Sequence, residues 1–170
     1  KPHLWWHASG SVHRLREYIR AGADLDIRDE KQNTAMMMAA LRGQVDAVSA
    51  LVAAGAPIDS TNIDGRTALM MAATRGHADV VQVLIDGGAS LDIRSLHGHT
   101  ALIFAAFRNK LEAVEMLLEK GADVDVRDNR GRTALFHALF AGHTRMVNLL
   151  LRRAEFEKDE VSLQIIHKRY

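Results

Sequence analysis

The sequence predicts an all-α solenoid built from stacked pairs of helices. The prediction rests on three lines of residues that recur along the 170-residue chain with one common period of 33. The lines are Thr34, Thr67, Thr100 and Thr133; then Gly22, Gly55, Gly88 and Gly121; then Gly10, Gly43, Gly76, Asn109 and Gly142. A period of this length indicates a chain in which each unit packs mainly against its two neighbours.

The unit that begins at Thr67 is typical, and its pattern predicts two short helices. Thr67 is expected to be an N-cap, because its hydroxyl can accept from the free N–H groups of the first helical turn. Apolar residues with helical spacing follow, and Gly76 is expected to end this helix in the left-handed conformation. A second helix is expected over 79–85, before Gly87–Gly88. In the next unit Asn109 replaces the helix-ending glycine, and asparagine also tolerates the left-handed conformation.

The two ends of the chain differ from its middle. We expect one domain over 1–170, with an N-terminal capping repeat over 1–22, four repeats over 23–154 and a C-terminal cap over 155–170. The ends of a solenoid must cover an outer face, so their composition departs from the repeat. Trp5 and Trp6 belong to the first cap, and two adjacent tryptophans cannot both face one core from a helix.

The repeated pattern resembles the ankyrin repeat family. The residues that carry the resemblance are Thr67-Ala68-Leu69, Ala72-Ala73, Gly76-His77, Val80-Val81, Leu84-Ile85 and Gly88-Ala89. The resemblance implies stacked helix pairs, loops that project as β-hairpin fingers, and a concave face that binds other proteins. In one departure, alanine replaces the proline of the family's Thr-Pro-Leu-His in every repeat. In the other, its histidine is replaced by apolar residues, for which we expect apolar packing: Met37, Met70, Ile103 and Phe136.

The concave face that the resemblance implies contains the candidate binding residues. Large apolar residues stand at positions where the family exposes variable side chains: Leu41, Ile63, Leu96, Phe107 and Phe140. Cationic and imidazole side chains are interleaved with them: Arg42, Arg66, Arg75, His97, His99, Arg108, Arg130 and Arg132. Such a mixture has the composition of a protein interface. We therefore predict partner binding here; the alternative is extra packing between fingers and helices.

Charge follows the same period. Arginines are expected in the last turn of the first helices and acids in the first turn of the second helices, where both complement the helix dipoles. This placement explains the row of arginines without a partner, although an acidic partner would also fit it. The net charge is only +1, which argues against a general nucleic-acid binder.

Catalysis and metal binding are disfavoured. The chain has no cysteine, and no phosphate loop, nucleophile elbow or zinc-protease motif is present. His97 and His99 lie two residues apart, but a structural zinc site normally needs four ligands. Asp123 and Asp125 have the spacing of a calcium loop, yet Arg127 occupies the next ligand position. We expect a non-catalytic protein without cofactor or metal.

These observations predict a monomeric interaction module that inhibits or sequesters a protein partner. The alternative is an assembly module that docks through Trp5 and Trp6. We expect no nucleic acid and no membrane as partners, because no apolar run is long enough to span a bilayer. We expect a soluble protein of the cytoplasm, or of the periplasm if a signal peptide preceded Lys1.

The first finger departs from the others. Gly65, Gly98 and Gly131 stand two residues before their threonines, but the first repeat has Gln32 there. A residue with a Cβ is disfavoured where φ is positive. We therefore expect Gln32 to have negative φ and the first finger to be less regular than the others.

Overall fold

The computed structural model describes residues 11–154 of the chain. The expectations about Trp5, Trp6 and the segment 155–170 lie outside this range.

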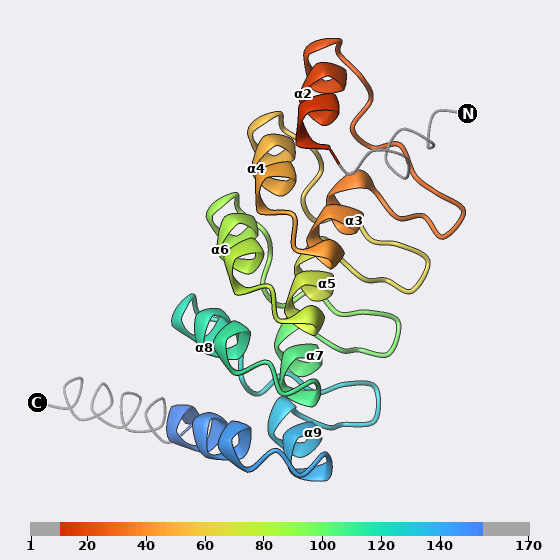
Figure 1. The fold of residues 1–170 in the computed structure, drawn as a ribbon. Helices are drawn as coiled ribbons and strands as arrows, with labels where there is room; N and C mark the ends of the chain where they lie inside the picture. The colour runs from red at the N-terminus through yellow and green to blue at the C-terminus, as the bar shows by residue number, and fades with distance from the viewer. Residues whose placement is uncertain (1–10, 155–170) are drawn as a thin grey trace, which may run out of the picture.

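The helices stand in two parallel rows, with the long loops projecting on one side (Figure 1). The inner row, next to these loops, consists of α3 (Ala35–Arg42), α5 (Ala68–Arg75), α7 (Ala101–Phe107) and α9 (Ala134–Phe140). The outer row consists of α2 (Val12–Arg20), α4 (Val45–Ala53), α6 (Ala78–Asp86), α8 (Leu111–Glu119) and a helical stretch over 144–154. The predicted all-α solenoid is confirmed. Within 11–154, no helix is both long and apolar enough to cross a membrane.

The inner helices begin where the repeated threonines predict. Each threonine hydroxyl accepts from the backbone N–H three residues ahead, as between Thr67 and Met70 at 3.3 Å. Gly76 ends α5 with φ of 76°, and Asn109 follows α7 with φ of 58°. Thus local sequence determines both ends of the helix, as the pattern predicted.

The core lies between the rows and between successive inner helices. Paired alanines such as Ala72 and Ala73 are fully buried and allow the inner helices to approach closely, while Val81 and Leu84 of α6 fill the space between the rows. The expected apolar packing at the family's histidine position holds in the first three repeats, where Met37, Met70 and Ile103 are at most 2% exposed. It is wrong for Phe136, which is 45% exposed, because among the described residues no further inner helix packs beyond α9.

The fingers are tight turns rather than regular β-hairpins, since no residue within 11–154 is assigned to a strand. Each turn closes with two backbone hydrogen bonds, as from Asn62 N–H to Arg66 O and from Gly65 N–H to Asn62 O. One backbone bond also joins each finger to the next, for example from Ile63 N–H to Lys31 O at 3.0 Å.

The prediction for Gln32 is wrong. Its φ is 61°, close to the 70° of Gly65, and the first finger has the same pair of closing hydrogen bonds as the others. The side chain that stabilises this turn is that of Asp29, three residues before Gln32. The Asp29 carboxylate accepts from the N–H groups of Lys31 and Asn33, at 2.9 and 2.8 Å. These bonds and the bond from the second finger stabilise the left-handed residue.

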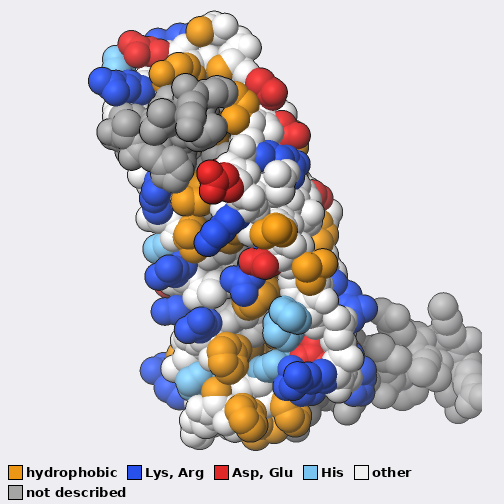
Figure 2. All heavy atoms as spheres, turned by 90° about the vertical axis from the view of Figure 1, so that its right-hand side faces the viewer, with side chains coloured by type: hydrophobic (Ala, Val, Ile, Leu, Met, Phe, Trp, Pro, Cys, Tyr) orange, Lys and Arg blue, Asp and Glu red, His pale blue; other side chains and the backbone are white. Residues whose placement is uncertain are grey.

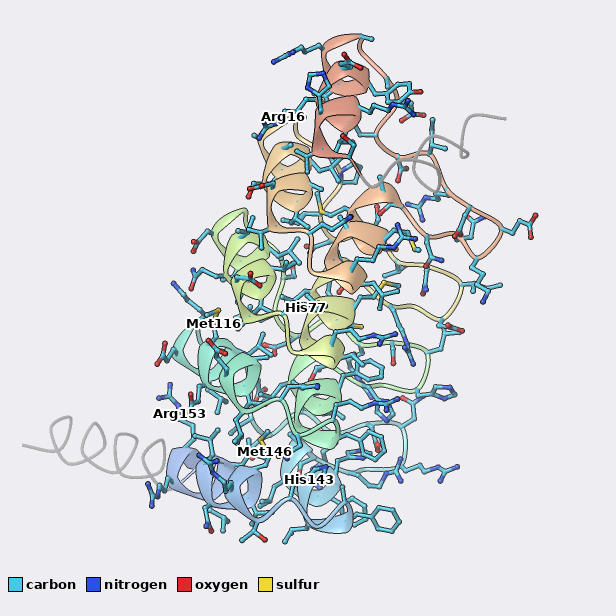
Figure 3. All side chains as sticks on the ribbon, in the orientation of Figure 1. Arg16, His77, Met116, His143, Met146 and Arg153 are labelled. Carbon is cyan, nitrogen blue, oxygen red and sulfur yellow. The ribbon has the colours of Figure 1, made fainter. Side chains whose placement is uncertain are left out.

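His77 and His143 join adjacent repeats. Both come from turns between an inner and an outer helix, where Figure 3 labels them. The Nε2 atom of His77 lies 3.2 Å from Leu41 O, and that of His143 lies 3.0 Å from Phe107 O. Structure therefore explains these two histidines, in agreement with their position in the repeat.

Candidate protein-binding groove

The side of the molecule that carries the fingers contains two neighbouring cavities. The lower cavity, of about 350 Å³, reaches from the second to the fourth repeat and is lined by Arg66, His99, Phe104, Phe107, Arg108, Arg132, His137 and Phe140, among others. The upper cavity, of about 600 Å³, lies between the second finger and the inner helices and also contains Arg66 and Arg108. We call the two cavities together the groove. In Figure 2, hydrophobic, His and cationic side chains interleave over the lower half of this face.

The apolar residues predicted for this face are exposed, with one exception. Phe140 is 80% exposed and Phe107 42% exposed, and both line the lower cavity. Ile63 and Leu96, at the fingertips, are 60% and 66% exposed. Leu41 was expected to be exposed, but it is half-buried, because its side chain packs against the core beneath the upper cavity.

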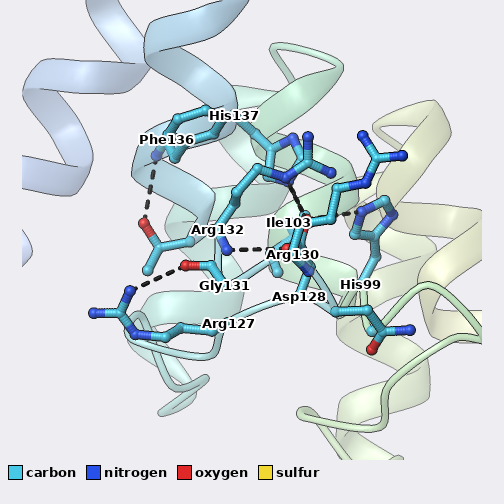
Figure 4. Close-up of polar contacts among 12 residues, drawn as sticks. His99, Ile103, Arg127, Asp128, Arg130, Gly131, Arg132, Phe136 and His137 are labelled. Carbon is cyan, nitrogen blue, oxygen red and sulfur yellow. Dashed lines mark hydrogen bonds and ion pairs between the residues drawn. The ribbon is translucent and has the colours of Figure 1, made fainter.

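Asp128 organises the floor beside the lower cavity (Figure 4). Its side chain is completely buried, and its Oδ1 accepts from the N–H groups of Arg130 and Arg132, each at 2.9 Å. Its Oδ2 accepts from Arg132 Nε at 2.9 Å and lies 2.9 Å from His137 Nε2. One carboxylate thus fixes both the fourth finger and a histidine of α9.

These contacts determine the protonation state of Asp128. Burial raises the pKa of its carboxyl group, but hydrogen bonds from the backbone of Arg132 and Arg130 and from the side chain of His137 outweigh burial and hold the pKa below its ordinary value. Asp128 is therefore an anion at neutral pH, and its charge is balanced locally by Arg132.

His99 lies in an aromatic cluster next to this carboxylate. Its ring meets Phe104 and His137 edge to face, each at 5.2 Å between ring centroids. Its Nε2 is buried and lies 3.3 Å from Asp128 Oδ2 without the alignment of a hydrogen bond. Burial lowers the pKa of His99, and the neighbouring His137 lowers it further, against the opposing effect of Asp128.

His99, Asp128 and His137 are the described residues whose geometry would admit a metal ion. Their ligand atoms lie within 4.8 Å of one another. The oxygen that would bind the ion already accepts from Arg132, whose positive charge opposes a second cation at the same place. The hydrogen-bond network therefore accounts for the arrangement. The pair singled out in the sequence, His97 and His99, has its rings 6.1 Å apart, and the second of them faces Asp128.

The structure brings most of the predicted site residues together. Those that line the groove are Leu41, Arg66, Arg75, His97, His99, Phe107, Arg108, Arg132 and Phe140. Those that line neither cavity are Arg42, Ile63, Leu96 and Arg130. Three of the latter occupy fingertips and extend the same face outward.

Phe104, Asp128 and His137 were missed. A signal for His137 is present in the sequence, because it interrupts a repeated column that otherwise holds Met38, Met71 and Phe104. Asp128 looked like an ordinary turn residue, since Asp29 stands at the equivalent position of the first finger.

Stacked helix pairs with a recessed, aromatic and basic face define a repeat scaffold with one recognition surface. A family model described as ankyrin repeats (3 copies) matches residues 4–95 and 88–160, so the chain belongs to the ankyrin repeat family. Ankyrin repeats are generally protein–protein interaction modules and are typically non-catalytic. A search of curated proteins found no match.

Proposed function

We propose that the groove binds an extended segment of a protein partner, with Phe107 and Phe140 as the apolar anchors of the complex. The observation that carries the proposal is the exposure of Phe140, 80% of whose surface is open beside a cavity of about 350 Å³. Exposed aromatic rings next to a cavity are what a partner buries in the centre of an interface. Occlusion of the bound segment would inhibit or sequester the partner.

Substitution of the two phenylalanines tests this proposal. Phe107→Ala and Phe140→Ala should each weaken partner binding by about 1–3 kcal/mol, because each removes a ring that the complex would bury. The partner is first captured from the source cell with the unsubstituted protein. Its affinity for each purified variant is then measured by calorimetry.

Leu151→Ala is the matched control, since Leu151 is 42% exposed on the outer row and lies outside both cavities. This variant should retain full affinity. Phe140→Ala should leave the melting temperature nearly unchanged. A large drop in melting temperature with unchanged affinity would place these residues in the fold and overturn the proposal.

The proposal also specifies a monomer that works in the cytoplasm without nucleic acid or membrane. Sedimentation of the complete chain tests the monomer directly. A concentration-dependent dimer that disappears when Trp5 and Trp6 are replaced by alanine would favour the assembly module instead.

A further inference from the structure

We infer that the segment bound by the groove is acidic and extended, and that its Asp or Glu side chains pair with Arg66 and Arg108. This inference rests on the proposed function, because it specifies the partner of the same face.

The lining of the groove is strongly biased in charge. The cations that line it are Lys31, Arg66, Arg75, Arg108, Lys110 and Arg132. The only acidic residue among the lining residues is Asp64. Arg132 is paired with the buried Asp128, so the other five cations carry the excess of positive charge. This excess of positive charge inside a recess attracts a negatively charged partner more strongly than the same charges on an open surface.

Arg66 and Arg108 are presented to the groove without a carboxylate of their own. The guanidinium of Arg66 stacks over Phe104 at 4.6 Å from the ring centroid, and that of Arg108 lies 5.7 Å from the centroid of Phe107. Within 11–154 neither makes an ion pair. Stacking orients the plane of a guanidinium and leaves its N–H edge free to bind a carboxylate with two parallel hydrogen bonds.

The placement of acidic residues in the middle of the stack points the same way. Within their bounds, the inner helices α3, α5, α7 and α9 contain no Asp or Glu. In the middle of the outer row, α4, α6 and α8 contain no Lys or Arg and carry the acids Asp46, Asp79, Asp86, Glu112, Glu115 and Glu119. The two ends of that row, α2 and the helical stretch over 144–154, carry arginines. Helix dipoles explain a cation at the end of an inner helix, but not the cations that the fingers add at Lys31 and Arg66.

The repeat spacing defines the pattern of the partner. Neighbouring helices pack about 8–10 Å apart, and an extended chain advances about 3.3 Å per residue. An extended segment that runs along the solenoid therefore meets a new repeat at about every third residue. We expect acidic residues at this interval, with apolar residues between them that contact Phe107 and Phe140.

The test uses three fluorescein-labelled peptides of one design, with alanine and leucine between every third residue. That residue is glutamate in the first peptide, glutamine in the second and phosphoserine in the third. Fluorescence anisotropy with the complete chain should show the glutamate peptide binding at least about tenfold more tightly than the glutamine peptide at about 50 mM salt, with most of this advantage lost at about 500 mM.

Arg66→Gln and Arg108→Gln should each remove about fivefold or more of the preference for the glutamate peptide. Arg145→Gln is the matched control, because Arg145 is exposed on the outer row and lines neither cavity. Binding of the captured partner to the same variants separates the two proposals. Suppose that Phe140→Ala weakens the binding of that partner, while both arginine variants bind it with full affinity. The inference that the partner segment is acidic is then refuted, and the proposal that the groove is the binding site stands.

Three other results would also overturn the inference. The first is equal binding, or no binding, of the glutamate and glutamine peptides. The second is binding of the phosphoserine peptide alone, which would identify a phosphorylated segment. The third is a dimer at low salt that the glutamate peptide does not dissociate, which would identify the acidic outer row of a second copy as the occupant.

Discussion

Gln32 and Gly131 occupy equivalent positions in the first and fourth fingers, with φ of 61° and 76°. The left-handed conformation is unfavourable for a residue with a Cβ by about 1–2 kcal/mol, and glycine is free of this penalty but loses more chain entropy on folding. Gln32→Gly should therefore raise the free energy of unfolding by about 1 kcal/mol, measured by urea denaturation.

The reverse substitution, Gly131→Gln, is the matched control. A Cβ added at Gly131 would meet no atom within 4 Å, so only its backbone conformation is tested. It should lower the free energy of unfolding by about 1 kcal/mol. Gly65 would be a poor control, because a Cβ there would lie 2.9 Å from Leu96 N. Equal stability of Gln32→Gly and the unsubstituted protein would show that the turn carries no strain.

His99 should give the stability of the protein a pH dependence near neutrality. Burial, followed by the effect of His137, lowers its pKa, so the folded state binds fewer protons than the unfolded state below the ordinary pKa of histidine. The stability that this group contributes is complete above its ordinary pKa and is lost as the pH falls through it. The free energy of unfolding should decrease between about pH 7.5 and 5.5.

His99→Gln should make this decrease smaller, as measured by denaturation at several pH values. Asp128 does not interfere, because its lowered pKa confines its effect to more acidic solutions, where stability is lost as the carboxylate is protonated. An unchanged slope in the variant would assign the pH dependence to other histidines.

At the residue scale, sequence reasoning predicted the exposure of Phe107 and Phe140 from their register in the repeat. It was wrong for Leu41, which has the same register but packs against the core. It failed for Gln32, whose stabilising contact comes from the preceding Asp29 and from the next finger. It also missed Asp128, whose role depends on a histidine nine residues away in the next helix.

The helix is the element whose ends the sequence predicts best, and the caps can be tested singly. Thr100 is fully buried, and its hydroxyl accepts from Ile103 N–H at 3.3 Å. Thr100→Ala should lower the free energy of unfolding by about 0.5–2 kcal/mol, because it leaves this N–H unsatisfied. Thr100→Ser keeps the hydroxyl and should lower the free energy of unfolding distinctly less than Thr100→Ala does. Equal losses in the two variants would assign the effect to the buried methyl group instead.

The fingers were less predictable than the helices. Their length and turn residues are visible in the sequence, but each is completed by a backbone bond from its neighbour, such as that from Leu96 N–H to Asp64 O. This pairing depends on how the repeats are stacked. For the same reason the cavities were not foreseen, because the residues that line the lower one, from Arg66 to Phe140, belong to successive repeats.

At the scale of the whole molecule, one repeat should be removable. Deletion of 67–99 takes out one period and brings α3 against α7, which presents the same buried pair of alanines, Ala105 and Ala106. The shortened chain should still unfold in one transition. Because 33 of 170 residues are removed, the slope of its free energy of unfolding against urea concentration should fall by about one fifth.

Deletion of 67–97 is the matched control, since it removes almost the same length but breaks the period of 33. This variant should fold poorly or unfold in separate steps. If both deletions behaved alike in urea denaturation, the register of the repeats would not be what holds the stack together.

Acids on α4, α6 and α8 and cations along the groove on the opposite side make the middle of this molecule an electric dipole across its short dimension. A net charge of +1 conceals this polarity, so the net charge alone says little about how the protein meets other molecules. In the field of an acidic surface the molecule experiences a torque that turns its fingers forward before contact. Orientation would thus precede collision, and the rate of productive encounter would depend on ionic strength more steeply than the net charge suggests.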